Sequence, residues 1–278
     1  MLGYDPDSIS LSTSDFFLIY KELERNFISI PRIYSLNDKL GVFIGEYVKE
    51  DMCNVLIQYP DFIEKYFTKS LEILSSLQGI TEFSPVQFRK FDKEKFTYEM
   101  NFLEKGTRKG FEVKSISFPE LKIVKIFEPV IDFLTNHNQY VFAHRDFHSR
   151  NILVSGIHQP ELKIIDYQDA RMGHPYYDLV SLVFDPYLNV YEKINEFTIE
   201  KYSELSGFAF NHEIYYASAL QRILKALGSY LYLVFEKKQE KYIPSISNAC
   251  DVLLFIKKYY NPDENIYIYS EEVRYNLS

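Results

Sequence analysis

The chain has 278 residues, of which 46% are hydrophobic, so it can bury a sizeable core in one large domain or two lobes. Its 31 basic and 39 acidic residues give a formal net charge of −8. That balance disfavours nucleic acid and anionic membranes as partners, since both need a concentrated positive field. The cysteines, Cys53 and Cys250, lack metal-ligand spacing and indicate two buried thiols in a reducing compartment. The sequence shows neither a signal peptide nor an apolar run of roughly 20 residues, so we expect a cytoplasmic protein, and we take it to be a monomer.

Hydrophobic spacing predicts a small strand-bearing region at the N-terminal end. The predicted elements there are a helix from Ser14 to Phe27, strands at 30–36 and 39–48 with a turn at Asn37 and Asp38, and a helix at 61–79 ending in Gly79. The strand at 30–36 is the one partner that the sequence predicts for the strand at 39–48. The sequence therefore predicts a two-stranded sheet covered by one helix.

The rest of the chain is predicted to be mostly helical, with short strands in its middle. The predicted helices lie at 92–106, 118–138 (Pro119 in the first turn, Pro129 inside), 176–184, 191–205, 212–236 and 243–260. Three runs, "YVFAH", "NILV" and "LKIID", are too short for helices and rich in β-branched residues, which favours strands. The order of elements predicts an α+β fold.

Polar residues are concentrated in "AHRDFHSRNILV", residues 143–154, between two of these short strands. Asp146 and Asn151 lie in this segment, and Asp166 follows the next strand. Such a unit is expected to bring the three side chains together at one end of a small sheet. Two carboxylates and an amide oxygen form an all-oxygen environment that suits Mg²⁺. Phosphoryl transfer from a nucleotide uses such a set, with one carboxylate accepting the proton of the attacking hydroxyl.

The segment "HRDFHSRN" matches the protein-kinase pattern of His-Arg-Asp followed by Asn five residues after the Asp. From about Pro31 onward the chain resembles the aminoglycoside phosphotransferase and choline kinase group, which has a protein-kinase-like two-lobed fold. Within that group, "HRDFHSRN", "IDYQDARMGHPYYDLVSL" and "ALQRILKALG" look most like the anomeric sugar kinases. Those enzymes phosphorylate N-acetylmuramate and N-acetylglucosamine at C1 for cell-wall recycling. The resemblance implies an ATP-dependent kinase that uses Mg²⁺, with a nucleotide and a small molecule as its partners.

The resemblance also implies roles for individual residues. Asp146 is the expected catalytic base, and Asn151 and Asp166 are the expected metal ligands. The expected hinge to the nucleotide lies in "GEYVKED" at Glu46, Tyr47 and Val48. The residues expected near the acceptor are Arg150, Gln168 and Asp169, and those expected to support the catalytic loop are His144, Arg145 and Asp178.

The same resemblance implies a partial N-terminal lobe at 1–50 and a C-terminal catalytic lobe at 51–278. A complete N-terminal lobe of this fold carries a phosphate-covering loop and a basic residue that pairs with a helix carboxylate, here Glu22 or Glu24. No Gly-rich loop precedes the hinge, and no lysine precedes the first predicted helix. We therefore expect the reading frame to continue upstream of Met1 for on the order of 50 residues, the length of three short strands and their loops.

Several alternatives remain open at this point. The acceptor could be an aminoglycoside or an amino alcohol, or the chain could be a non-catalytic binding protein that retains the C-terminal lobe. A metallohydrolase built on His144, Asp146, His148 and Asp166 is a more distant alternative. A protein kinase is disfavoured, because Tyr167 and Gln168 stand where the protein-kinase motif has Phe-Gly and no Ala-Pro-Glu follows.

Overall fold

The computed structural model describes residues 2–4, 11–80, 86–118, 122–137, 139–207 and 209–278. The chain divides into two compact units, each assembled from separate stretches. Unit 1 comprises Met1–Lys90, Tyr140–Val183 and Glu192–Ala209, and unit 2 comprises Phe91–Gln139, Phe184–Tyr191 and Phe210–Ser278. These units are clusters of contacts, so the expected lobes at 1–50 and 51–278 stay a prediction.

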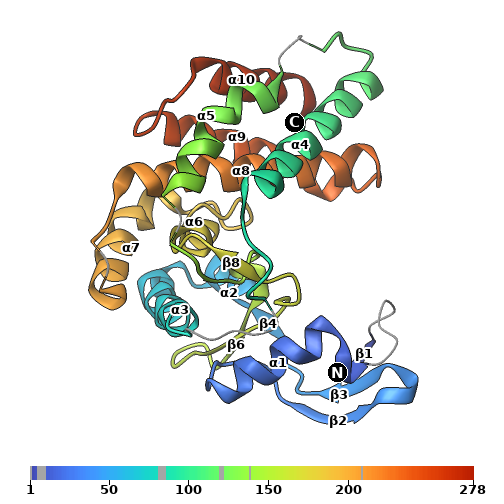
Figure 1. Cartoon of the computed structure of the whole chain (residues 1–278), viewed down its shortest axis with the longest axis vertical. Coiled ribbons are helices and arrows are strands. Elements are labelled where there is room, and N and C mark those ends of the chain that lie inside the picture. Colours follow the sequence, from blue (N-terminus) through green and yellow to red (C-terminus); the bar gives the residue numbers. More distant parts are fainter. Residues whose placement is uncertain (1, 5–10, 81–85, 119–121, 138, 208) are drawn as a thin grey trace. The chain divides into compact units, whose positions relative to one another are not determined.

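Unit 1 begins with a three-stranded antiparallel sheet in the order β1-β3-β2, covered by helix α1 (Figure 1). Its elements are β1 (Leu2–Tyr4), α1 (Asp15–Arg25), β2 (Ile33–Asn37) and β3 (Val42–Gly45). Helix α1 starts as predicted, because the Ser14 side chain accepts a hydrogen bond from the Phe17 N–H at 3.3 Å. The prediction of two strands was wrong, since β1 pairs with the other edge of β3. A strand of three residues offers too few positions for alternation to be recognised.

The remaining strands of unit 1 form two further small sheets, in the orders β4-β6-β7 and β5-β8. They are β4 (Glu50–Asp51), β5 (Val141–Ala143), β6 (Ile152–Ser155), β7 (Glu161–Ile164) and β8 (Arg171–Gly173). The three predicted strands are present, but they do not share one sheet as expected. Strand β5 pairs with β8, and β6 pairs with β7 and β4. Neither β4 nor β8 was predicted, because "ED" and "RMG" carry no apolar alternation.

Helices complete unit 1 around these strands. They are α2 (Met52–Gln58), α3 (Ile63–Gln78), α6 (Tyr176–Val183) and α7 (Tyr191–Ser206), of which α7 belongs to unit 1 from its second residue. The short 3-10 helices of the chain are η1 (Leu11–Thr13), η2 (Asp38–Leu40), η3 (Pro60–Phe62), η4 (Ser149–Asn151) and η5 (Glu240–Tyr242). Helix α3 buries the predicted apolar face and stops before Gly79. Every residue of α6 is buried, which fixes the carboxylate of Asp178 inside the unit.

Unit 2 is helical, with α8 at its centre in contact with α4, α5 and α9, and with α10 against α9 (Figure 1). The helices are α4 (Lys93–Val113), α5 (Ile123–Asn136), α8 (His212–Phe235), α9 (Ile243–Lys257) and α10 (Glu264–Leu277). Helix α4 continues past its predicted end at Gly106. Pro129 lies inside α5, and Pro119 lies outside the described residues.

The structure thus confirms the predicted mixed α+β fold, with a small N-terminal strand region and a large helical C-terminal part. Cys53 and Cys250 are both buried, as predicted. Within the described ranges, no helix combines the length and the apolar character needed to cross a membrane.

Candidate active site

The loop between β5 and β6 holds Asp146 and Asn151 next to each other. The amide Nδ2 of Asn151 donates to the backbone carbonyl of Asp146 at 3.0 Å, and the N–H of His148 donates to the same carbonyl at 3.0 Å. Both side chains are half-buried. The Asn151 side chain therefore closes the loop by binding the Asp146 backbone, and it remains partly exposed to solvent.

The next strand brings Asp166 to the same place. Strands β6 and β7 pair antiparallel, and the Ile165 N–H donates to the Asn151 carbonyl at 3.0 Å. The side chain of Asn151 lies 3.4 Å from Oδ2 of Asp166, and Gln168 Nε2 donates to Oδ1 of Asp166 at 2.7 Å. Asn151 thus contacts both the Asp146 loop and the Asp166 carboxylate, as the sequence spacing predicted.

The donor chemistry of this cluster fits a hard divalent cation. Mg²⁺ prefers carboxylate and amide oxygens as ligands. The carboxylate of Asp166 and the side-chain amide of Asn151 are neighbours, joined by a 3.4 Å contact from the amide nitrogen Nδ2 to Oδ2 of Asp166. Asp166 is exposed, so its remaining lone pairs are accessible to an ion from solvent.

Asp178 lies beneath the loop, in the first turn of α6. Its carboxylate accepts hydrogen bonds from the backbone N–H groups of His144 at 2.6 Å and Arg145 at 2.9 Å. The side chain is 1% exposed. Arg145 has φ of 80°, a left-handed conformation that costs energy for a residue with a side chain. The two charge-assisted bonds to Asp178 offset that cost and fix the direction in which the chain leaves β5.

His144 is fully buried and electrically neutral at physiological pH. Burial lowers the pKa of its imidazole to about 4, although the nearby carboxylates of Asp146 and Asp166 raise the pKa in opposition. A buried neutral ring with no exposed edge is not placed to take a proton from a substrate.

The expected hinge at residues 46–48 links β3 to β4. The carboxylate of Glu46 is bound by Lys163 Nζ at 2.5 Å and by the Arg32 N–H at 3.0 Å. Hydrogen bonding from Lys163 is the main reason why the pKa of Glu46 is lowered. The bonds of Glu46 and the burial of Val48 anchor the segment at its two ends, and Tyr47 between them is 69% exposed.

The residues expected near the acceptor lie around the cluster without forming a single contact set. Gln168 is bonded to Asp166, and Asp169 lies 4.0 Å from the Arg145 guanidinium. Arg150 is exposed in η4, directly before Asn151. Gln168 and Asp169 come shortly after Asp166 in the chain, and Arg150 directly precedes Asn151, so all three lie near the candidate metal ligands.

The two carboxylates considered for pairing with a lysine have partners within α1. Glu22 pairs with Arg25 at 2.8 Å, and Glu24 accepts from the Tyr20 hydroxyl at 3.0 Å and pairs with Lys21 at 3.4 Å. The metallohydrolase alternative finds no support. Across the part of the chain that the structure describes, no three His, Cys, Asp or Glu side chains are grouped so as to hold a metal ion.

Two residues that contact this region were not singled out from the sequence. Lys163 binds Glu46, and Arg89 donates to the Gln168 carbonyl at 3.4 Å. Lys163 occupies an ordinary polar position of β7, and Arg89 precedes α4 outside any motif. No sequence signal identifies either residue, because each contact joins segments far apart in the chain.

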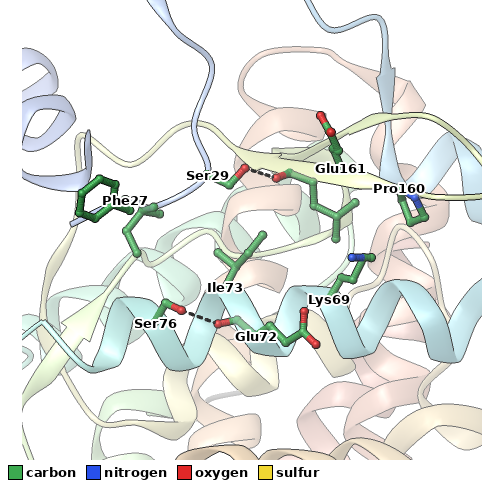
Figure 2. A pocket seen from close by; sticks show the side chains of 10 residues that line it. Phe27, Ser29, Lys69, Glu72, Ile73, Ser76, Pro160 and Glu161 are labelled. Atoms are coloured by element: carbon green, nitrogen blue, oxygen red, sulfur yellow. Dashed lines mark hydrogen bonds between the residues drawn. The ribbon is translucent and has the colours of Figure 1, made fainter. Parts of the chain in front are cut away.

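Figure 2 shows an open pocket of about 320 Å³ in unit 1. Its walls come from the residues after α1, from α3, and from the first residues of β7 with the proline before them: Phe27, Ile28, Ser29, Lys69, Glu72, Ile73, Ser76, Pro160, Glu161 and Leu162. None of the residues predicted for catalysis, metal binding or nucleotide binding lines it. The pocket is therefore separate from the cluster formed by Asp146, Asn151 and Asp166.

Comparison with known proteins shows the family. Residues 10–208 match the model of a family described as "Phosphotransferase enzyme family". The chain belongs to this family. An N-acetylmuramate/N-acetylglucosamine kinase from Neisseria meningitidis serogroup B is 27% identical to this phosphotransferase-family chain over 129 residues, 43% of the chain. The matched stretch spans only 38% of that relative's length.

Solved structures share the fold. A choline kinase from Streptococcus pneumoniae has a TM-score of 0.62 at 13% identity, with 93% of this chain and 86% of that chain covered. The AMP-bound complex of spectinomycin phosphotransferase has a TM-score of 0.59 at 15% identity, with 89% of this chain and 85% of that chain covered. At such identities the likeness shows the protein-kinase-like fold of the phosphotransferase family and nothing finer.

Proposed function

We propose that this protein is an ATP-dependent small-molecule kinase with Asp146 as its general base and Asn151 and Asp166 as its magnesium ligands. The observation that carries the proposal is the position of Asn151, whose amide contacts the Asp146 loop at 3.0 Å and the Asp166 carboxylate at 3.4 Å. One residue thus ties the candidate base to the candidate ligand. The family supports the same class of chemistry.

In the proposed reaction an acceptor hydroxyl attacks the γ-phosphorus of ATP. The bond from that phosphorus to the β,γ-bridging oxygen breaks, ADP leaves, and the hydroxyl proton passes to the Asp146 carboxylate. Bound Mg²⁺ would neutralise the charge of the nucleotide phosphates. Asp178 would hold Asp146 in position, because the Asp178 carboxylate binds the backbone N–H groups of His144 and Arg145, the two residues before Asp146.

The nucleotide base is assigned to the segment at residues 46–48. The Glu46 side chain is fully engaged by Lys163 and Arg32, so the segment would meet a base through backbone groups and the exposed Tyr47 ring. ATP is the proposed co-substrate. Spectinomycin phosphotransferase, which shares the fold, has been solved with AMP.

The proposed acceptor is the anomeric hydroxyl of N-acetylmuramate or N-acetylglucosamine. The support is the relative named for those two sugars, together with the segments "HRDFHSRN" and "IDYQDARMGHPYYDLVSL". Arg150, Gln168 and Asp169 are the proposed acceptor-side residues, and they lie at the ends of the two segments that carry the metal ligands.

The test is a panel of acceptors incubated with Mg²⁺ and ATP: N-acetylmuramate, N-acetylglucosamine, kanamycin and choline. We expect ADP release with either sugar and an anomeric phosphate by NMR. Arg150→Ala should raise the KM for the sugar more than the KM for ATP. The matched control is Arg25→Ala, which removes another exposed guanidinium, one that pairs with Glu22.

Phosphorylation of kanamycin or choline, with neither sugar accepted, would replace the proposed acceptor by an aminoglycoside or an amino alcohol. Failure to bind Mg²⁺ and ATP at all would instead favour a non-catalytic binding protein.

A further inference from the structure

Helix α1 is linked to the segment that follows Asp166 at two separate points, directly by an aromatic contact and indirectly through the side chain of Arg89. Both contacts lie within unit 1. Their common feature is that they join the first helix of the chain to the residues that set the direction of the Asp166 carboxylate.

The aromatic contact is a stack of three rings. The Phe16 ring of α1 lies parallel to the Tyr167 ring at a centroid distance of 5.5 Å and an interplanar angle of 10°. Phe16 also stacks on Phe43 of β3, at a centroid distance of 5.2 Å and an interplanar angle of 19°. Tyr167 is 3% exposed, and burial raises the pKa of its phenol, so the ring remains neutral. Phe16 therefore connects the N-terminal sheet to the residue next to Asp166.

The ionic contact is made by Arg89. Its guanidinium pairs with the carboxylate of Asp15, the first residue of α1, and donates to the Gln168 carbonyl at 3.4 Å. The backbone carbonyl of Arg89 accepts from the Met172 N–H at 2.7 Å. Arg89 thus holds the stretch from 168 to 172 along one side and the start of α1 on the other.

Asp166 needs such support because its backbone is strained. Its φ is 68°, in the left-handed region that residues with side chains occupy at a cost. The residue before it is anchored by the bond from the Ile165 N–H to the Asn151 carbonyl at 3.0 Å. The residue after it, Tyr167, is anchored by the ring stack, and Gln168, whose side chain bonds Asp166, is anchored by Arg89.

We propose that Phe16 and Arg89 are positioning residues that hold Asp166 in its metal-binding conformation, so that helix α1 sets the affinity of the site for Mg²⁺ and its nucleotide. The inference rests on the proposed function of Asp166 as a metal ligand. Loss of either contact should weaken binding of the Mg²⁺–nucleotide pair.

The aromatic half is tested by Phe16→Leu, with Phe17→Leu as the matched control. Phe17 is the neighbouring half-buried ring of α1, but it stacks on Tyr20 and not on Tyr167. Binding of a fluorescent ATP analogue is titrated with Mg²⁺. We expect Phe16→Leu to raise the half-saturating Mg²⁺ concentration by about 3- to 10-fold, the range for losing an aromatic pair. Phe17→Leu should match the wild type, and Phe16→Tyr, which keeps the ring, should restore tight binding.

The ionic half is tested by Arg89→Gln, with Arg25→Gln, at the end of α1, as the control. Arg25 pairs with Glu22 and does not reach the segment after Asp166. We expect Arg89→Gln to raise the half-saturating Mg²⁺ concentration by at least 3-fold, since a charge-assisted contact is lost. Hydrogen exchange of the amides at 166–170 should quicken in Arg89→Gln and in Phe16→Leu, and in neither control.

The outcomes separate the two proposals. Suppose that the wild type binds the nucleotide and that all four variants have its half-saturating Mg²⁺ concentration. The positioning inference is then wrong, and the proposed function stands. If the wild type shows no Mg²⁺-dependent nucleotide binding, the proposed function fails and the inference fails with it. Equal weakening in test and control variants would assign the effect to general destabilisation and would also overturn the inference.

Discussion

The aspartates of the candidate site differ in burial, and the difference separates their chemical capacities. Asp178 is 1% exposed, and each of its two carboxylate oxygens accepts a hydrogen bond from a backbone N–H group. Its charge therefore stabilises the backbone at His144 and Arg145. Asp146 is half-buried at the tip of the loop that Asp178 holds. Asp166 is exposed, where an ion can reach it from solvent. The arrangement thus places one fixed carboxylate beneath two accessible ones.

Asp146→Asn tests the proposed base. The substitution keeps the size of the side chain and removes its proton acceptor, so kcat should fall by about 10²- to 10⁴-fold, the usual effect of losing a general base. The melting temperature should stay close to that of the wild type, because the substitution keeps the backbone carbonyl of Asp146 that accepts from the Asn151 amide. Steady-state kinetics and thermal melting are the measurements.

Asp61→Asn is the control for that experiment, since it neutralises an exposed carboxylate in η3 and should leave kcat unchanged. An Asp146→Asn variant with near-complete activity would exclude Asp146 as the base.

At the residue scale, the sequence predicts which polar residues gather, and it does so through spacing between short strands. Asn151 contacts the backbone carbonyl of Asp146 and the carboxylate of Asp166, so the three residues are neighbours, and their roles stay predictions. The sequence does not reveal the left-handed backbone at Arg145 and Asp166, because neither residue type marks such a conformation as a glycine would. Arg89 is equally hidden, since its partners lie 74 positions earlier and 79 positions later in the chain.

At the element scale, helices with long apolar stripes are predictable and very short strands are not. The stripes at α1, α3 and α8 each repeat over several turns, which averages out single exceptions. Strand β8, with three residues, is fixed by its pairing to β5, which no local pattern encodes. Helix α4 extends beyond Gly106 because Gly106 serves close packing: a Cβ there would lie 3.3 Å from the Gly228 carbonyl oxygen of α8.

Gly228→Ala tests that close packing. A Cβ at Gly228 would lie 2.9 Å from Cα of Leu103 and 3.2 Å from its backbone N, and backbone atoms of α4 cannot turn aside. Overpacking of this kind costs about 1–3 kcal/mol, while the gain in helix propensity from Gly to Ala is roughly 1 kcal/mol. We expect a net loss of about 1 kcal/mol in the free energy of unfolding, measured by urea denaturation.

Gly79→Ala serves as the control for Gly228→Ala. Gly79 follows α3 with φ of −74°, and a Cβ there meets its nearest atoms at 3.5 Å, an ordinary contact. Its stability should equal or slightly exceed that of the wild type. Equal stability of the two variants would contradict the close approach of α4 and α8.

At the scale of the whole molecule, each unit carries one buried cysteine. Cys53 lies in α2 of unit 1 at 1% exposure, and Cys250 lies in α9 of unit 2 at 0%. All of the proposed nucleotide and metal residues belong to unit 1. The two thiols can therefore report separately on the unit that contains the site and on the unit that does not.

We expect both thiols to resist labelling in the folded protein. Burial raises the pKa of the Cys250 thiol to about 12, so that at pH 8 only about one molecule in ten thousand carries the reactive thiolate, and the side chain is also inaccessible. Labelling then requires local or global unfolding. In urea, Mg²⁺ with ATP should slow labelling of Cys53 more than that of Cys250, because a ligand stabilises the structure that binds it. The single-cysteine variants Cys250→Ala and Cys53→Ala isolate each thiol. Equal protection of both thiols would mean that the two units unfold together, and protection of Cys250 alone would contradict the assignment of the nucleotide to unit 1.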